Sequence, residues 1–195
     1  FSFCLLIVTG VASAQEGDPR QVDLVIKGDH IVTMDGHGTI YKDAALAIDE
    51  GLIVAIGPAS EILTAYQPGK LLDGDNRVVM PGLVNGHSHA AMTLLRGIAE
   101  DMALLDWLTN YIFPAELEFV DADLVRIGTE LACWEMIRGG TTSFVDMYFY
   151  PDEIAGVVDR CGLRAIVASP HIDYPSPGFS GWDDSFAAAI DFVKR

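Results

Sequence analysis

The stretch VVMPGLVNGHSHAAMTLLRG, residues 78–97, runs from an apolar segment through a Pro-Gly turn and a second apolar run into two histidines. Side chains at positions i and i+2 of a strand point to the same face, so this spacing predicts that His87 and His89 lie side by side. In parallel α/β folds, sites are built where strands end. Two imidazoles there can bind Zn²⁺ or another divalent metal, with Asn85 as a supporting hydrogen-bond partner.

A histidine pair with one residue between its members is a weak signal by itself, because such pairs also occur in polar loops. The context favours the metal site, since an apolar strand and turn directly precede the pair. Gly82 and Gly86 leave the backbone room to turn at this point.

Length and composition limit the class of protein. The 195 residues are half apolar and 21% charged, which predicts a folded domain with a small appended one. Lys and Arg number 12 against 28 Asp and Glu, giving a net charge of -16. A chain this acidic repels a phosphate backbone, so nucleic acid is excluded as a partner.

The first fourteen residues, FSFCLLIVTGVASA, carry no charge and end in Ala-Ser-Ala. Their apolar run is too short to span a bilayer, and the ending suits signal peptidase. We therefore expect a signal peptide over 1–14, a periplasmic or secreted protein, and no membrane association after cleavage. A buried strand or helix is the alternative. Neither a start Met nor a basic segment precedes the run, so we expect that the N-terminus is missing.

Two kinds of sequence pattern follow along the chain. Between residues 22 and 56, short apolar runs are separated by the turns DGHG and DEG, which predicts strands and hairpins. PASEILTAY then predicts a short helix, and KLLDGDNRVVMPG returns to strand. After Gly86, helix patterns alternate with the strand patterns TTSFVDMYF and LRAIVASPHI, which are apolar enough to be buried on both faces, and this predicts parallel βα units. The helix pattern DADLVRIGTELACWEMIRGG has an Asp near its start and a Gly-Gly stop. The helix pattern WDDSFAAAIDFVKR continues to Arg195, so we expect that the chain is cut there.

Three cysteines say little about function. Cys4 lies in the predicted signal peptide, and Cys133 and Cys161 lie in apolar helix patterns. We expect buried free thiols at these two positions, with a disulfide between them as the alternative in an exported protein.

Four motifs occur in order: MPGLVNGHSHAAMTLLRG, LLDWLTNYIFPAE, GGTTSFVDMY and GLRA. With them, residues from about 22 to 195 resemble the metal-dependent amidohydrolase superfamily, and more narrowly its methylthioadenosine/S-adenosylhomocysteine deaminase and chlorohydrolase group. The resemblance implies an α/β fold. Residues 80–195 would form about the first three strands of a truncated (β/α)8 TIM barrel, and residues 15–79 the N-terminal part of a small β-sandwich domain.

The resemblance also implies roles for three residues. His87 and His89 would be zinc ligands from the first barrel strand, and Glu116 would bind the ribose of the substrate. An exposed acid on a helix is the alternative for Glu116. The family's remaining ligands and its proton-shuttling glutamate come from later strands, so we expect the catalytic residues beyond Arg195.

Other candidates have weaker support. Trp107 could line the same pocket, although core packing is favoured. Asp146 ends the second strand on the site side, with no family role that transfers to it. His171 follows the third strand and could contact substrate, whereas His30 and His37 are expected at the surface.

The sequence thus predicts a fragment of a zinc-dependent aminohydrolase that removes ammonia from a purine-like or other heterocyclic small molecule. Several adenosyl-specific members have an arginine after the GLRA strand where this chain has SPHIDYP, which leaves the nucleoside substrate open. One alternative is an amidohydrolase that cleaves a cyclic amide or a C–Cl bond. Another is a short metal-binding chain without catalysis. The oligomeric state stays open, with a homo-oligomer as one option.

Overall fold

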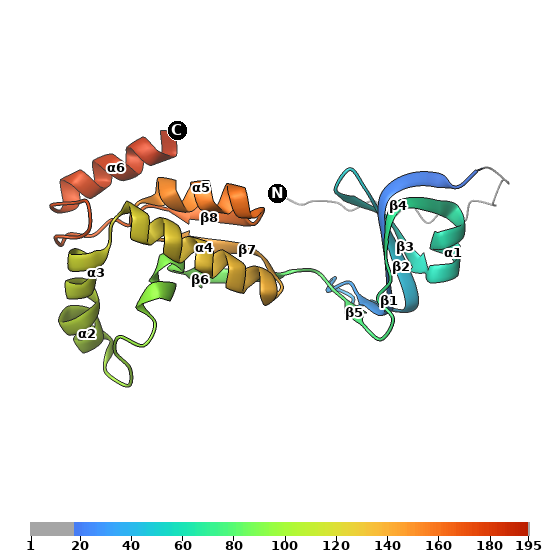
Figure 1. Ribbon diagram of the computed structural model, residues 1–195, viewed down its shortest axis with the longest axis horizontal. Helices are drawn as coiled ribbons and strands as arrows, with labels where there is room; N and C mark the ends of the chain where they lie inside the picture. The colour runs from blue at the N-terminus through green and yellow to red at the C-terminus, as the bar shows by residue number, and fades with distance from the viewer. Residues whose placement is uncertain (1–17, 195) are drawn as a thin grey trace. The chain divides into compact units, whose positions relative to one another are not determined.

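The computed structural model describes residues 18–194 (Figure 1). The chain divides into two compact units, Phe1–Pro81 and Gly82–Arg195. The signal peptide predicted over 1–14 lies outside the described residues and stays a prediction. Within residues 18–194, no helix combines the length and apolarity needed to cross a membrane.

The first unit contains one five-stranded sheet, in the order β3-β2-β1-β4 with β5 also paired to β1. The β1–β2 and β2–β3 pairs are antiparallel, whereas β4 and β5 run parallel to β1. Glu50 and Gly51 join β2 to β3 with φ of 49° and 75°, which is the geometry of a two-residue hairpin loop and confirms the predicted turn. The elements are β1 (Arg20–Val32), β2 (Ile40–Asp49), β3 (Leu52–Pro58), α1 (Ala59–Ala65), β4 (Tyr66–Leu72) and β5 (Val78–Val79).

Apolar side chains pack on both faces of this sheet. Val25 and Ala47 belong to a cluster with Ile62 of α1, so the helix covers one face. A smaller cluster around Ile31 lies apart from it, beside an apolar groove of about 400 Å³. The described residues of this unit form a single sheet, so the second layer of the predicted β-sandwich stays a prediction.

The second unit contains a three-stranded parallel sheet in the order β6-β7-β8, as the alternation of strands and helices predicted. A 3₁₀ helix, η1, directly follows β6, and a π-helical turn, η2, joins α2 to α3. The elements are β6 (Leu83–Ser88), η1 (Ala90–Leu95), α2 (Leu104–Trp107), η2 (Leu108–Ile112), α3 (Phe113–Phe119), α4 (Ala122–Arg138), β7 (Thr141–Met147), α5 (Pro151–Cys161), β8 (Arg164–Ala168) and α6 (Trp182–Lys194).

Helix α4 begins and ends where its sequence predicted. The Asp121 side chain accepts a hydrogen bond of 2.8 Å from the backbone N–H of Leu124 and so caps the first turn. The helix ends at Gly139, and Gly140 takes a φ of 83° that suits a residue without a Cβ.

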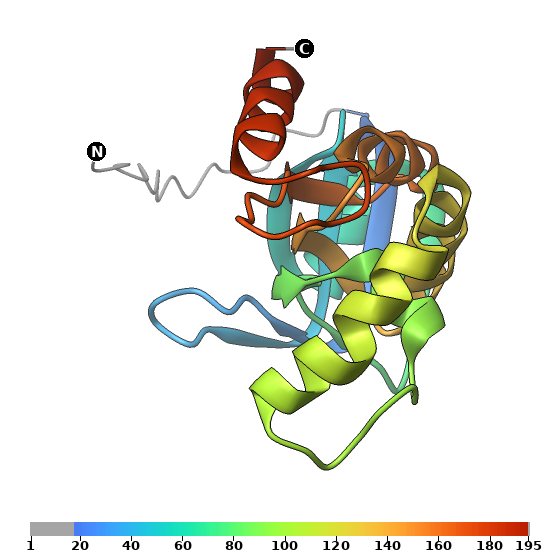
Figure 2. The same ribbon diagram turned by 90° about the vertical axis from the view of Figure 1, so that its left-hand side faces the viewer.

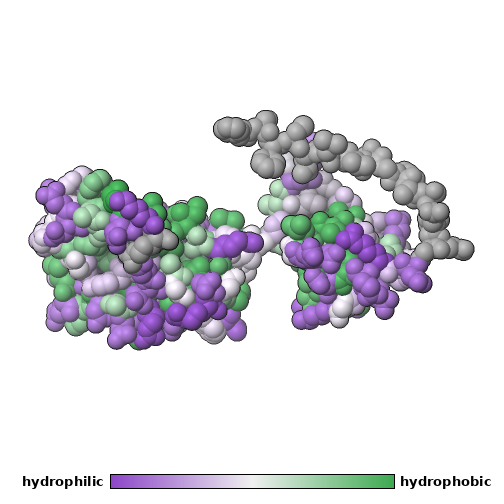
Figure 3. Space-filling view, turned by 90° about the horizontal axis from the view of Figure 1, so that it is seen from above, coloured by the Kyte–Doolittle hydropathy of each residue, from purple (hydrophilic) through white to green (hydrophobic). Residues whose placement is uncertain are grey.

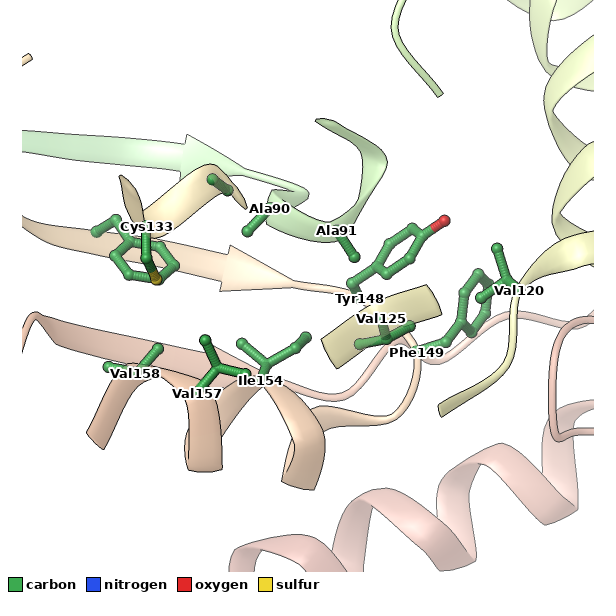
Figure 4. Packing of buried hydrophobic residues seen from close by; sticks show 12 residues of the cluster. Ala90, Ala91, Val120, Val125, Cys133, Tyr148, Phe149, Ile154, Val157 and Val158 are labelled. Atoms are coloured by element: carbon green, nitrogen blue, oxygen red, sulfur yellow. The ribbon is translucent and has the colours of Figure 1, made fainter. Parts of the chain in front are cut away.

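The core of this unit lies between the sheet and its helices, where α4 and α5 pack against each other (Figures 1 and 2). Cys133 is buried and Cys161 half-buried, both as free thiols, and burial raises the pKa of Cys133 to about 12. Figure 4 shows Phe149 and Val125 converging on the core from a strand end and a helix. The core cluster consists of Ala90, Ala91, Val120, Val125, Ala132, Cys133, Phe144, Tyr148, Phe149, Ile154, Val157 and Val158.

The expectation that the strands after Gly86 are buried on both faces is wrong for β8 in the described chain. Ile166 of β8 is 68% exposed, because the helices of the second unit cover the other face of the sheet. Val84 of β6 is likewise 71% exposed. Figure 3 shows further apolar side chains among the polar ones on the surface of each unit.

Candidate metal and substrate site

The histidine pair lies at the carboxyl end of β6. His87 is in the strand, and His89 is the first residue after it, directly before η1. Their ring centroids are 5.2 Å apart and their planes stand at 81°. Asn85 Oδ1 accepts a hydrogen bond of 3.2 Å from the backbone N–H of His87, which supports the turn of the chain here. The structure therefore brings the two imidazoles together, as their spacing predicted.

His89 is oriented by a backbone carbonyl of the neighbouring strand. Its Nδ1 lies 2.7 Å from the carbonyl oxygen of Met147 at the end of β7. Because a carbonyl oxygen can only accept, Nδ1 carries the proton and the lone pair of the neutral ring is on Nε2. Histidines that bind metals are commonly held in this way, with one nitrogen donating to a carbonyl and the other free for the metal.

Asp146 lies close to the pair but does not line its cavities. Its side chain is fully buried, and Oδ1 accepts hydrogen bonds of 2.8 Å from the Ser88 hydroxyl and 2.6 Å from the Ala90 backbone N–H. Burial raises the pKa of Asp146, while these two bonds and the nearby His89 lower it.

Glu116 is a buried carboxylate that lines the site. It lies in the first turn of α3 and is 5% exposed, so the exposed-acid alternative is wrong. The Tyr148 hydroxyl donates a hydrogen bond of 2.8 Å to Glu116 Oε1. Burial raises the pKa of Glu116, whereas the Tyr148 hydroxyl and the nearby His89 lower it. Burial raises the pKa of the Tyr148 hydroxyl, and the neighbouring Glu116 carboxylate raises it further.

One cavity of about 260 Å³ is lined by His89 together with Glu116 and Tyr148. These three are the polar residues of its lining, and the other lining residues are apolar or aromatic. A more open cavity of about 480 Å³ adjoins it and is lined by both histidines. Trp107 lines both cavities, so the expectation that it packs in the core is wrong. An apolar cavity lined by a few polar groups is typical of a small-molecule site.

The remaining histidines lie elsewhere. His171 lies against Trp182 of α6, with ring centroids 3.6 Å apart and ring planes at 47°, and its Nδ1 lies 2.9 Å from Ser185 Oγ. It is not among the residues that line the cavities described above. His30 and His37 are exposed in the first unit, as expected.

Sequence reasoning missed Tyr148 and the carbonyl of Met147. Both follow or end the second strand of the sheet, in the segment DMYF. A polar aromatic residue at the end of an apolar strand was the signal that could have identified Tyr148, because strand ends meet at one edge of a parallel sheet.

The histidines provide only part of a metal site. Among residues 18–194, no group of three or more His, Cys, Asp or Glu side chains is arranged to hold a metal ion. Zinc in proteins usually takes at least three protein ligands. The donors present nevertheless fit such a metal, because two imidazoles stand side by side and one has its free nitrogen fixed by Met147.

A histidine pair at the end of a parallel strand, beside an apolar cavity with a buried carboxylate, is typical of metal-dependent enzymes on α/β folds. Residues 78–194 match the amidohydrolase family, which is more than half of the chain. The chain therefore belongs to the amidohydrolase family.

The chain is similar to proteins named as deaminases. It is 44% identical over 176 residues to a 5-methylthioadenosine/S-adenosylhomocysteine deaminase of Nitratidesulfovibrio vulgaris, covering 90% of this chain and 39% of that protein. It is 46% identical over 176 residues to a deaminase of the same name from Syntrophus aciditrophicus, covering 90% and 40%. The chain thus spans about two fifths of the length of these curated relatives.

Two solved structures have the same fold over this region. An adenosine deaminase from Xanthomonas campestris with bound zinc superposes with a TM-score of 0.86 at 38% identity, covering 90% of this chain and 40% of that one. An atrazine chlorohydrolase from Arthrobacter aurescens with zinc gives a TM-score of 0.73 at 21% identity, covering 88% and 43%. The second likeness extends to the fold alone.

Proposed function

We propose that this chain is the N-terminal part of a zinc-dependent aminohydrolase that releases ammonia from a purine-like or other heterocyclic amine. The observation that carries the proposal is the pair His87 and His89, with Nε2 of His89 free beside the cavity that contains Glu116. The deaminase names of relatives at 44% and 46% identity support the reaction. Zinc in the deaminase at 38% identity supports the metal.

His87 and His89 would hold the zinc together with ligands from chain outside the described residues. When bound, zinc would act as a Lewis acid and lower the pKa of a water molecule bound to it toward neutrality. Met147 keeps the Nδ1 proton of His89 in place through its carbonyl oxygen, so the ring presents the same nitrogen throughout.

Glu116 would bind the substrate. One of its oxygens accepts the Tyr148 hydrogen bond, which leaves the other free for a hydroxyl or amine of the substrate. The aromatic and aliphatic lining of the cavity would hold the apolar body of the substrate and exclude water from it.

We infer that β6, β7 and β8 are the first three strands of a (β/α)8 TIM barrel over residues 80–195, and that residues 15–79 are part of a β-sandwich domain. Two observations support a barrel. The strands are parallel with helices on one face, and that sheet's other face carries exposed apolar side chains such as Val84 and Ile166. Inward-facing side chains of further strands would cover them.

We also propose that the protein is exported, on the strength of the signal-like residues 1–14. The substrate of an exported enzyme of this kind would be a small heterocyclic compound outside the cytoplasm. The mass of the complete protein in solution would decide whether it forms a homo-oligomer.

The test is a turnover assay on the complete zinc-loaded protein. Ammonia release would be measured with adenosine, methylthioadenosine and S-adenosylhomocysteine, and chloride release with a chlorinated triazine. We expect ammonia from at least one nucleoside and its loss in His89→Ala. Chloride release alone would replace the deaminase proposal with a chlorohydrolase. Zinc binding without either product would favour the non-catalytic alternative.

A further inference from the structure

Asp146 is a buried carboxylate that the proposed reaction does not use. It shares its face of β7 with Phe144, which lies in the core under the helices, so the carboxylate points to the helix side of the sheet. Cys133 of α4 lies close enough for Asp146 to raise the pKa of its thiol. The carboxylate therefore lies behind the histidine pair, on the side away from solvent.

Asp146 and Met147 accept hydrogen bonds from three consecutive residues, which are Ser88, His89 and Ala90. Asp146 Oδ1 accepts from the Ser88 hydroxyl at 2.8 Å and from the Ala90 backbone N–H at 2.6 Å, and Met147 O accepts from His89 Nδ1 at 2.7 Å. The Ser88 hydroxyl also lies 2.9 Å from the Val145 carbonyl oxygen, so its single proton can go to either acceptor. The backbone on both sides of the His89 ring is thus fixed to the neighbouring strand.

The bond to Ala90 also explains how a histidine can occupy this position. His89 is the N-cap residue of η1, and its side chain makes no capping hydrogen bond. N-cap positions favour Ser, Thr, Asp and Asn, because their side chains accept from the free N–H groups of the first turn. Here Asp146 accepts from Ala90 across the sheet, so the imidazole of His89 is free to point into the site.

This arrangement is costly for folding. Asp146 is fully buried, and its Oδ2 has no hydrogen-bond partner among the described residues. A buried charge with an unpartnered oxygen destabilises a folded protein, and such exceptions are concentrated at functional sites.

We propose that Asp146, acting through Ser88 and the Ala90 N–H, is a positioning residue for the metal-binding histidines. This inference rests on the proposed zinc site. Residues that orient metal ligands contribute a factor of about 10 to 100 in metal affinity. The Asp146 carboxylate fixes where the His89 ring stands, while Met147 fixes which of its nitrogens faces the site.

The test measures zinc retention by the complete protein against a chelator, beside the absorption spectrum of the cobalt-loaded form and thermal unfolding. Asp146→Asn removes the charge but keeps the shape, and Ser88→Ala removes one bond. We expect each to raise the zinc dissociation constant about 10-fold or more and to alter the cobalt spectrum, with folding preserved. The matched control Ser143→Ala, at the far end of β7, should stay within about twofold of the wild type.

The outcomes separate this inference from the proposed function. A wild-type protein that retains no zinc overturns both. If the wild type retains zinc and both variants retain it equally well with unchanged cobalt spectra, the positioning role is overturned and the zinc site stands. Should Asp146→Asn fail to fold, the comparison of Ser88→Ala with Ser143→Ala decides.

Discussion

At the scale of the residue, the contacts that hold the site join residues far apart in the sequence. The two-residue spacing of His87 and His89 follows from strand periodicity, which is local. Met147 lies 58 residues beyond His89, and Tyr148 lies 32 beyond Glu116, so their contacts depend on how the strands pair. The resemblance pointed to Glu116, but only the structure shows that it is buried.

Tyr148→Phe tests the Glu116 interaction. Burial raises the pKa of Glu116, so binding through its carboxylate is present above that pKa and is lost as the pH falls through it. The Tyr148 hydroxyl lowers the pKa, so its removal should shift the loss to higher pH. Since a hydrogen bond to a charged group contributes about 1.5–3 kcal/mol, KM should rise about 10-fold or more at neutral pH, with a smaller change in kcat.

The measurement is the pH dependence of KM and kcat for the complete protein, with substrates that have or lack ribose hydroxyls. Tyr111→Phe, at a half-exposed tyrosine before α3, is the matched control and should behave like the wild type. An unchanged KM in Tyr148→Phe with the hydroxyl-bearing substrate would contradict the proposed role of Glu116.

At the scale of the element, α4 shows what sequence patterns cannot supply. Asp121 and Gly139 marked its ends correctly. Its close packing on η1 was not predicted, because a glycine inside a helix only hints at a close neighbour. A Cβ on Gly128 would overlap the carbonyl oxygen and carbon of Ala91, so this glycine lets α4 approach the segment that follows the histidines.

Gly128→Ala and Gly156→Ala should therefore have opposite effects. The first forces α4 away from η1 and should reduce the free energy of unfolding by about 1–3 kcal/mol. The second lies inside α5, where the nearest atom to a new Cβ is Arg160 Nη1 at 3.5 Å, and should increase stability by about 0.5–1 kcal/mol. Urea unfolding of the complete protein measures both. Equal effects of the two substitutions would argue against the close approach of α4 and η1.

At the scale of the whole molecule, the alternation of strands and helices along the chain predicted the parallel sheet. The prediction that its strands are buried on both faces was wrong. Apolar strands are typical of sheets covered on both faces. In the described residues one face is covered by helices, and Val84 and Ile166 on the strands remain exposed. Periodicity reports which side chains are apolar, whereas their burial depends on which other segments are present.

Residues 18–194 expressed alone should therefore aggregate and lack activity, because exposed apolar patches and free strand edges promote association. Ile166→Lys should improve the solubility of this short chain. In the complete protein the same change should be destabilising, since it would bury a charge in the proposed barrel. Light scattering after size-exclusion chromatography measures both. A short chain that is monomeric and active would contradict the proposed architecture.

The most direct test of the central claim is the zinc content of the complete protein with and without each histidine. We predict about one bound zinc per chain in the wild type or in His37→Ala, whose histidine is exposed in the first unit. His87→Ala and His89→Ala should each lose most of that zinc while keeping the wild-type circular dichroism spectrum. Full zinc content in both variants would show that the pair is not a metal site.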